Sequence, residues 1–142
     1  MNAMPRANAP KSTEIRTLFL ADHRRLDALL ERLISAFEAN DREDVQALWT
    51  LFERGLLAHL EAEENALIPA LRSTNPTEAD ALLREHAHFR DRLAELGAGI
   101  DLHIVRLETA RAFAAELLKH ADREDQILYR WRDLRTEDHP AH

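Results

Sequence analysis

The chain has 142 residues, the size of one ordinary domain, and its composition favours an all-helical fold. Hydrophobic residues make up 45% of the chain and charged residues 32%, which is enough apolar material for a core and argues against a disordered chain. Leucine and alanine number 23 each, whereas valine and isoleucine together number 8 and glycine 3. The residues that favour β-strands and tight hairpin turns are therefore scarce.

The charge and the missing cysteines exclude several classes of function. A net charge of −7 leaves no broad basic surface for a nucleic-acid backbone, and the absence of cysteine excludes disulfides, thiolate metal sites and a cysteine nucleophile. The longest stretch without a charged residue, Val45 to Phe52, is far too short for a membrane span, and residues 1–12 lack the apolar core of a secretory signal. We therefore expect a cytoplasmic protein that binds neither nucleic acid nor a membrane.

The first two predicted helices are long and amphipathic. Ser12 or Thr13 can cap the first helix, and the polar cluster at residues 40–42 ends it. Apolar residues at helical spacing continue the second helix from about residue 45 to residue 71. Pro69 should kink or end this helix near its C-terminus, because proline has no amide hydrogen to donate.

A clear turn precedes the third predicted helix. Asn75 is a good N-cap, Pro76 suits the first helical position, and Glu78 completes a spacing similar to a capping box. The apolar stripe of this helix then reaches Gly97 and Gly99, which we expect to end it.

The fourth predicted helix runs from about Asp101, through Ile104, to Trp131. Residues 1–11 form a flexible arm and residues 136–142 a polar tail, which leaves one domain over residues 12–135. Four long helices with three short connections predict an up-down-up-down antiparallel four-helix bundle.

Each predicted helix carries a histidine where its apolar stripe should hold a hydrophobic residue, and two helices carry a glutamate one turn later. These six residues are His23, His59, Glu63, His86, His120 and Glu124. In an antiparallel helix pair, residues at equal distance in sequence from the turn lie at the same height. The sequence midpoints between successive histidines fall in or near the predicted turns, so the four histidines should lie at one height in the bundle. Buried polar groups without compensation cost several kcal/mol each. The pattern therefore predicts a metal site in one layer of the bundle.

The donor types indicate the class of metal. Imidazole and carboxylate without sulfur suit iron, manganese or zinc. Two histidines for each ion, with Glu63 and Glu124 bridging, can hold two metals. A ferritin-like centre would need Glu-x-x-His on two helices, and among the inward-facing helices only Glu85 and His88 have that spacing.

The order of the motifs resembles the hemerythrin family, in particular its bacterial HHE cation-binding domains. The resemblance covers residues 12–132 and rests on His23, His59-Leu-Glu-Ala-Glu63, Glu85-His86 and His120-Ala-Asp-Arg-Glu124. It implies a hemerythrin-like bundle with a non-haem di-iron centre and an open coordination position for a small ligand such as dioxygen or nitric oxide. Two features depart from relatives in that family. Arg90 stands where oxygen-carrying hemerythrins have a fifth histidine, and the chain lacks the cysteine-bearing segment of the iron–sulfur-cluster repair proteins.

We therefore expect a di-iron protein, monomeric or homodimeric, that binds or senses dioxygen or nitric oxide or handles iron, with zinc or manganese as possible substitutes. One alternative is a di-iron enzyme or iron donor in the repair of nitrosative or oxidative damage. Another is a helical interaction module that holds zinc or no metal. Asp125 is the substitute bridge if Glu124 does not bind, and Tyr129 belongs to the core or rim or lines a ligand channel. The residues expected to lie outside the site are Glu61, Glu64, His88, His103, His139 and His142.

Overall fold

The computed structural model describes residues 12–129, and in that range all regular structure is helical. The α-helices are α1 (Ser12–Glu38), α2 (Arg42–Ala66), α3 (Ile68–Thr74), α4 (Pro76–Asp101) and α5 (Leu107–Glu124), and the π-helical turn η1 (Asp125–Tyr129) follows α5 directly. For these residues, the prediction of an all-helical fold is confirmed. The arm, the tail and Trp131 lie outside the described residues, as do the side chains of Ser12 and Thr13.

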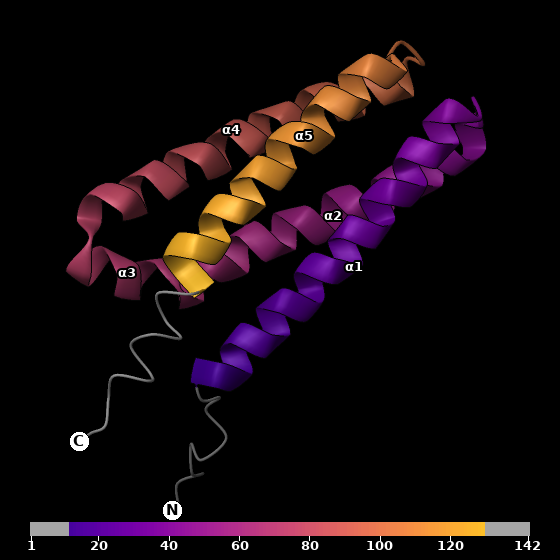
Figure 1. Cartoon of the computed structure of the whole chain (residues 1–142). Helices are drawn as coiled ribbons and strands as arrows, with labels where there is room; N and C mark the ends of the chain where they lie inside the picture. Colours follow the sequence, from indigo (N-terminus) through magenta and orange to yellow (C-terminus); the bar gives the residue numbers. More distant parts are fainter. Residues whose placement is uncertain (1–11, 130–142) are drawn as a thin grey trace, which may run out of the picture.

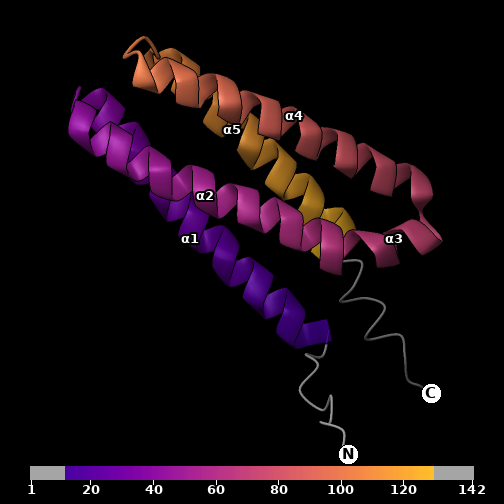
Figure 2. The same ribbon diagram turned by 180° about the vertical axis from the view of Figure 1, so that it is seen from behind.

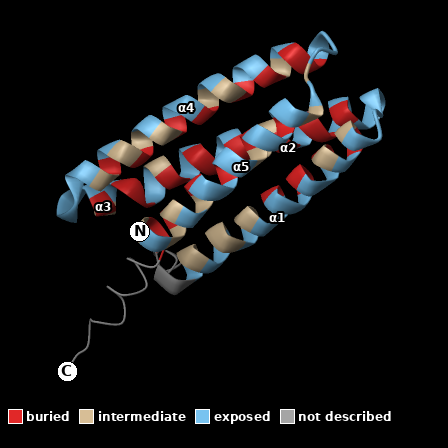
Figure 3. Ribbon diagram, turned by 45° about the horizontal axis from the view of Figure 1, so that its top comes forward, coloured by how far each residue is buried: buried red, intermediate tan, exposed pale blue. Residues whose placement is uncertain are grey.

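The four long helices pack side by side into a bundle (Figures 1 and 2). Helix α1 contacts α2 and α5, and α4 likewise contacts α2 and α5, so that each long helix has two long neighbours. The buried residues form stripes on the sides of the helices that face one another, and the exposed residues cover the outside (Figure 3). Within residues 12–129, no helix has the length and apolar character needed to cross a membrane.

The apolar core consists of two separate clusters. The larger cluster is built around Phe52, Leu93 and Phe113, and the smaller one around Leu67 and Leu82. Along every long helix, the predicted polar site residues lie between a member of the larger cluster and a member of the smaller one. The site therefore forms a polar layer between two apolar clusters.

The predicted turns near residues 40–42 and 73–76 and the predicted interruption of the second helix near Pro69 are confirmed. The Asp41 side chain caps α2 by accepting a hydrogen bond from the Asp44 amide, and Asn75 caps α4 by accepting one from the Glu78 amide. The predicted second helix is interrupted at Leu67, and Pro69 lies in the first turn of α3. A proline is tolerated there because the first amides of a helix have no carbonyl partner.

Two predicted boundaries are wrong. Helix α4 continues past both glycines to Asp101, and α5 begins at Leu107 rather than at Asp101, which leaves Ile104 exposed in a loop. The reason is a close approach: a Cβ atom at Gly99 would lie 2.7 Å from Cγ2 of Val105. This glycine lets the loop fold back against α4 instead of ending the helix.

We predict that Gly99→Ala destabilises the protein. An alanine in a helix interior ordinarily gains about 1 kcal/mol over glycine, but overpacking against a stiff neighbour costs about 1–3 kcal/mol. Thermal unfolding should show a lower Tm for Gly99→Ala than for the control Gly97→Ala. At Gly97 the nearest atom to a new Cβ is the indole Nε1 of Trp49, at 3.2 Å. A higher Tm for Gly99→Ala would contradict the close approach.

Candidate metal centre

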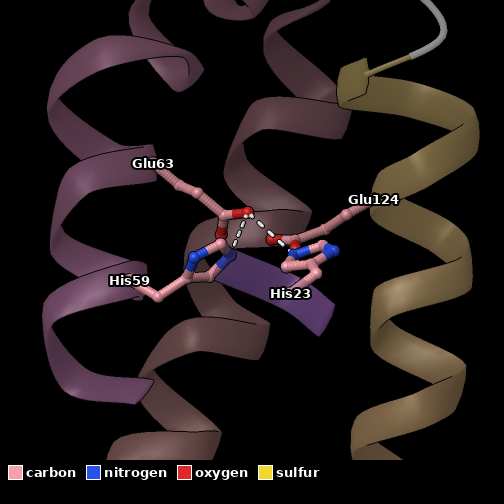
Figure 4. Close-up of side chains that lie close together, drawn as sticks. All are labelled: His23, His59, Glu63 and Glu124. Carbon is pink, nitrogen blue, oxygen red and sulfur yellow. Dashed lines mark hydrogen bonds and ion pairs between the residues drawn. The ribbon is translucent and has the colours of Figure 1, made fainter. Parts of the chain in front are cut away.

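The structure brings all six predicted site residues into one layer of the bundle. Helix α1 supplies His23, α2 supplies His59 and Glu63, α4 supplies His86, and α5 supplies His120 and Glu124. They form two groups that could each hold a metal ion, with ligand atoms within 4.8 Å of one another. Both glutamates belong to both groups, whereas each group has its own pair of histidines. Figure 4 shows the first group, in which His23 and His59 point toward the two carboxylates.

Each glutamate directs one oxygen toward each pair of histidines. For Glu63, Oε2 lies 3.0 Å from His59 Nε2 and 3.7 Å from His23 Nε2, and Oε1 lies 3.3 Å from His86 Nε2.

For Glu124, Oε1 lies 3.8 Å from His23 Nε2. Its other oxygen, Oε2, lies 2.8 Å from His86 Nε2 and 2.9 Å from His120 Nε2. Two carboxylates that divide their oxygens in this way have the arrangement of bridging ligands.

The buried carboxylates make the centre attractive to positive charge. Burial by itself lowers the pKa of His86, but contacts with Glu124 and Glu63 outweigh it and raise the pKa to about 10. Burial by itself raises the pKa of Glu63, but hydrogen bonds from the surrounding histidines bring this pKa well below its ordinary value. Protons on the imidazoles offset the carboxylate charge, and metal cations can take over that role.

The donor set fits metal ions. Glu63 Oε1 and His120 Nε2 are buried, and although each lies near an oppositely charged side chain, neither makes a hydrogen bond; a cation between the side chains would give each atom a coordination partner. Nitrogen and oxygen donors without sulfur suit iron, manganese or zinc.

Three of the four histidines contact a further carboxylate through Nδ1, the ring nitrogen that faces away from Glu63 and Glu124. Their Nδ1 atoms lie within hydrogen-bond distance of an outer oxygen in the pairs His59–Asp22 (2.8 Å), His86–Glu64 (2.8 Å) and His120–Glu85 (2.6 Å). A hydrogen bond donated by Nδ1 fixes the tautomer in which Nε2 is free to bind a metal.

These outer partners are not among the predicted site residues. The sequence pattern gives Asp22 no role, places Glu64 beside the ligands as a charge-tuning or solvated residue, and includes Glu85 only in the Glu85-His86 motif and in the ferritin-like spacing with His88. Each is adjacent in sequence to a predicted site residue. An acidic residue directly before or after an inward-facing ligand was the available signal, because such a neighbour lies about 100° around the helix, toward the adjacent helix.

The structure also separates the two histidines of α4. His86 is fully buried in the centre, whereas the side chain of His88 is 50% exposed and lies 3.5 Å from Glu116. His103 is exposed in the loop after α4, as expected, and Asp125 belongs to neither group. The ferritin-type pairing of Glu85 with His88 is therefore not formed, since Glu85 contacts His120 instead.

Tyr129 occupies the site rather than the rim. Its hydroxyl donates a hydrogen bond to Glu63 Oε2, and its ring centroid lies 5.2 Å from that of His23. Burial and the neighbouring carboxylates of Glu63 and Glu124 raise the pKa of Tyr129, which keeps the hydroxyl protonated as a donor. The π-helical turn η1 carries this side chain into the core next to Leu128.

One of three comparisons with known proteins identifies the family of this chain. Residues 14–132 match the family model of the Hemerythrin HHE cation binding domain, whereas the comparisons with curated proteins and with solved structures gave no match. The matched range includes all six residues of the two groups. Since the match extends over most of the sequence, the chain belongs to the hemerythrin HHE cation-binding domain family.

Proposed function

We propose that this protein is a non-haem di-iron protein that binds or senses a small ligand such as dioxygen or nitric oxide, or that handles iron. The observation that carries the proposal is the division of the glutamate oxygens, one toward each pair of histidines. The proposed ligands are His23, His59, Glu63, His86, His120 and Glu124.

The number of donor atoms supports two metal ions, each with a coordination position left for a further ligand. Each ion would receive two imidazole nitrogens and one oxygen from each bridging carboxylate. Iron held by these imidazole and carboxylate donors would supply the capacity to bind a small molecule at a position that the protein does not fill. Next to the ligands, Tyr129 supplies a hydroxyl donor, and the two apolar clusters lie on either side of the polar layer.

The same proposal includes the topology of the family. The short connections between α1 and α2 and between α3 and α4 support an up-down-up-down order of the four long helices, within a domain over residues 12–135.

Metal analysis tests the proposal directly. Protein purified from cells supplied with iron should contain two iron atoms per chain. A single zinc ion, or no metal, would favour a helical interaction module and overturn the di-iron proposal. If iron is present, anaerobic turnover assays with nitric oxide or peroxide separate a binding protein from an enzyme.

The bridging role predicts unequal losses of metal. Glu63→Ala or Glu124→Ala should remove more than half of the bound metal, because each residue contributes to both ions, whereas His120→Ala should leave a larger remainder. Metal-to-protein ratios measure this. Asp125→Ala is the control, and the bridge is misassigned if this variant loses metal while Glu124→Ala keeps it.

The two histidines of α4 give a matched pair of variants. His86→Ala should lower the iron content and the Tm of the metal-loaded protein, while His88→Ala should change neither, because only His86 faces the carboxylates. Metal analysis and thermal unfolding of both variants provide the measurement. Loss of iron in His88→Ala alone would contradict the orientation of α4.

Metal removal should destabilise the fold. Metal that binds only the folded state at a thousand times its Kd adds about 4 kcal/mol to the free energy of unfolding. For a chain of this size, such a change corresponds to a fall in Tm of about 10 °C on chelation. Thermal unfolding before and after chelation, with metal added back as the control, provides the measurement, and equal melting temperatures would exclude a structural contribution from the metal.

A further inference from the structure

The histidines of the two groups are not supported equally. Behind His86, Glu64 Oε2 lies 2.8 Å from Nδ1, and Arg90 binds both oxygens of Glu64 at 2.8 and 2.9 Å. This two-pronged ion pair fixes the carboxylate in orientation as well as in position. His86 is therefore clamped through a chain of two charged side chains.

His120, the other histidine of this group, is also backed by a carboxylate and an arginine, but through a single ion pair. Glu85 Oε1 lies 2.6 Å from His120 Nδ1, and Arg123 Nε lies 2.9 Å from Glu85 Oε2, while the hydrogen bond of the Arg123 side chain goes to Glu78. A hollow of about 790 Å³ between α4 and α5 is lined by these residues, but the His120 side chain remains only 5% exposed. Both histidines of the His86–His120 position are thus held by a carboxylate that an arginine holds in turn.

The other position has only one clamped histidine. His59 is held by Asp22, which Arg25 binds at 2.8 Å. Among residues 14–129, no outer carboxylate is hydrogen-bonded to His23 Nδ1. The His23 side chain is also 18% exposed, and its Nε2 has the longest distances to the shared carboxylates, 3.7 and 3.8 Å.

We propose that the two metal positions differ in retention: the His86–His120 position holds its ion firmly, and the His23–His59 position exchanges its ion. Arg90 and Arg123 act as positioning residues for the firm position, and Arg25 for the exchangeable one. This inference rests on the proposed function, because it requires two bound ions. Its physical basis is that outer partners of metal-binding histidines fix the ring and its tautomer, and their loss typically costs 10–100-fold in metal affinity.

The test measures release of metal rather than activity. Iron-loaded protein is reduced under anaerobic conditions and mixed with an excess of a chromogenic chelator of ferrous iron, so that absorbance follows the release of iron. Wild-type protein should release one iron at least about tenfold faster than the other. His23→Ala should purify with the slowly released iron and without the fast phase.

The arginine variants assign the two phases. Arg90→Gln and Arg123→Gln should accelerate the slow phase about tenfold and leave the fast phase unchanged, whereas Arg25→Gln should accelerate only the fast phase. Arg92→Gln is the matched control, because Arg92 lies on the same helix as Arg90 but pairs with Glu95 at 3.0 Å and with Glu116 at 3.8 Å, neither of which contacts the four site histidines. It should alter neither phase.

The outcomes separate this inference from the proposed function. Wild-type protein with two irons that leave at one rate would overturn the inference and leave the di-iron proposal intact. The inference is also wrong if Arg90→Gln releases iron no faster than Arg92→Gln. Protein that never binds two irons would overturn the di-iron proposal itself.

Discussion

Two carboxylates in the interior of a helical bundle are the constraint on which this structure depends. Glu63 and Glu124 are 0% and 1% exposed, and burying a charged group without compensation costs several kcal/mol. Compensation comes from four histidines, one from each long helix, whose Nε2 atoms surround the carboxylate oxygens. The helices must therefore stand at matching heights, because a shift of one turn, about 5.4 Å, would leave a carboxylate with only the histidine of its own helix.

Most of this layer could be predicted from the sequence because it depends on spacing within single helices. A glutamate four residues after a histidine lies on the same helix face, and the apolar stripe selects His86 over His88 as the inward residue. The outer partners depend instead on how neighbouring helices are rotated against each other. Glu64 on α2 reaches His86 on α4, a pairing that no periodicity within one helix encodes.

The loop after α4 shows the same limit for the fold. Glycine near the end of an amphipathic pattern usually signals a helix end, and that rule gave the wrong boundary here. Gly99 leaves space for the side chain of Val105. Val105 approaches Gly99 only because the chain reverses direction at His103, where φ is 58°. The boundary follows from a tertiary contact, which is why local sequence signals failed to locate it.

The division of the core into two apolar clusters makes the two ends of the bundle separable. The smaller cluster joins the first turns of α1 to α3 and η1, so both ends of the described chain meet on one side of the polar layer. The two clusters unfold together only if contacts across the polar layer couple them. Those contacts are made by polar side chains rather than by apolar packing. When the layer is not held together, the end with the smaller cluster can open as a local unit while the larger cluster stays folded. Amide hydrogens of α3 and of the start of α1 would then exchange with solvent before those around Phe52 and Leu93.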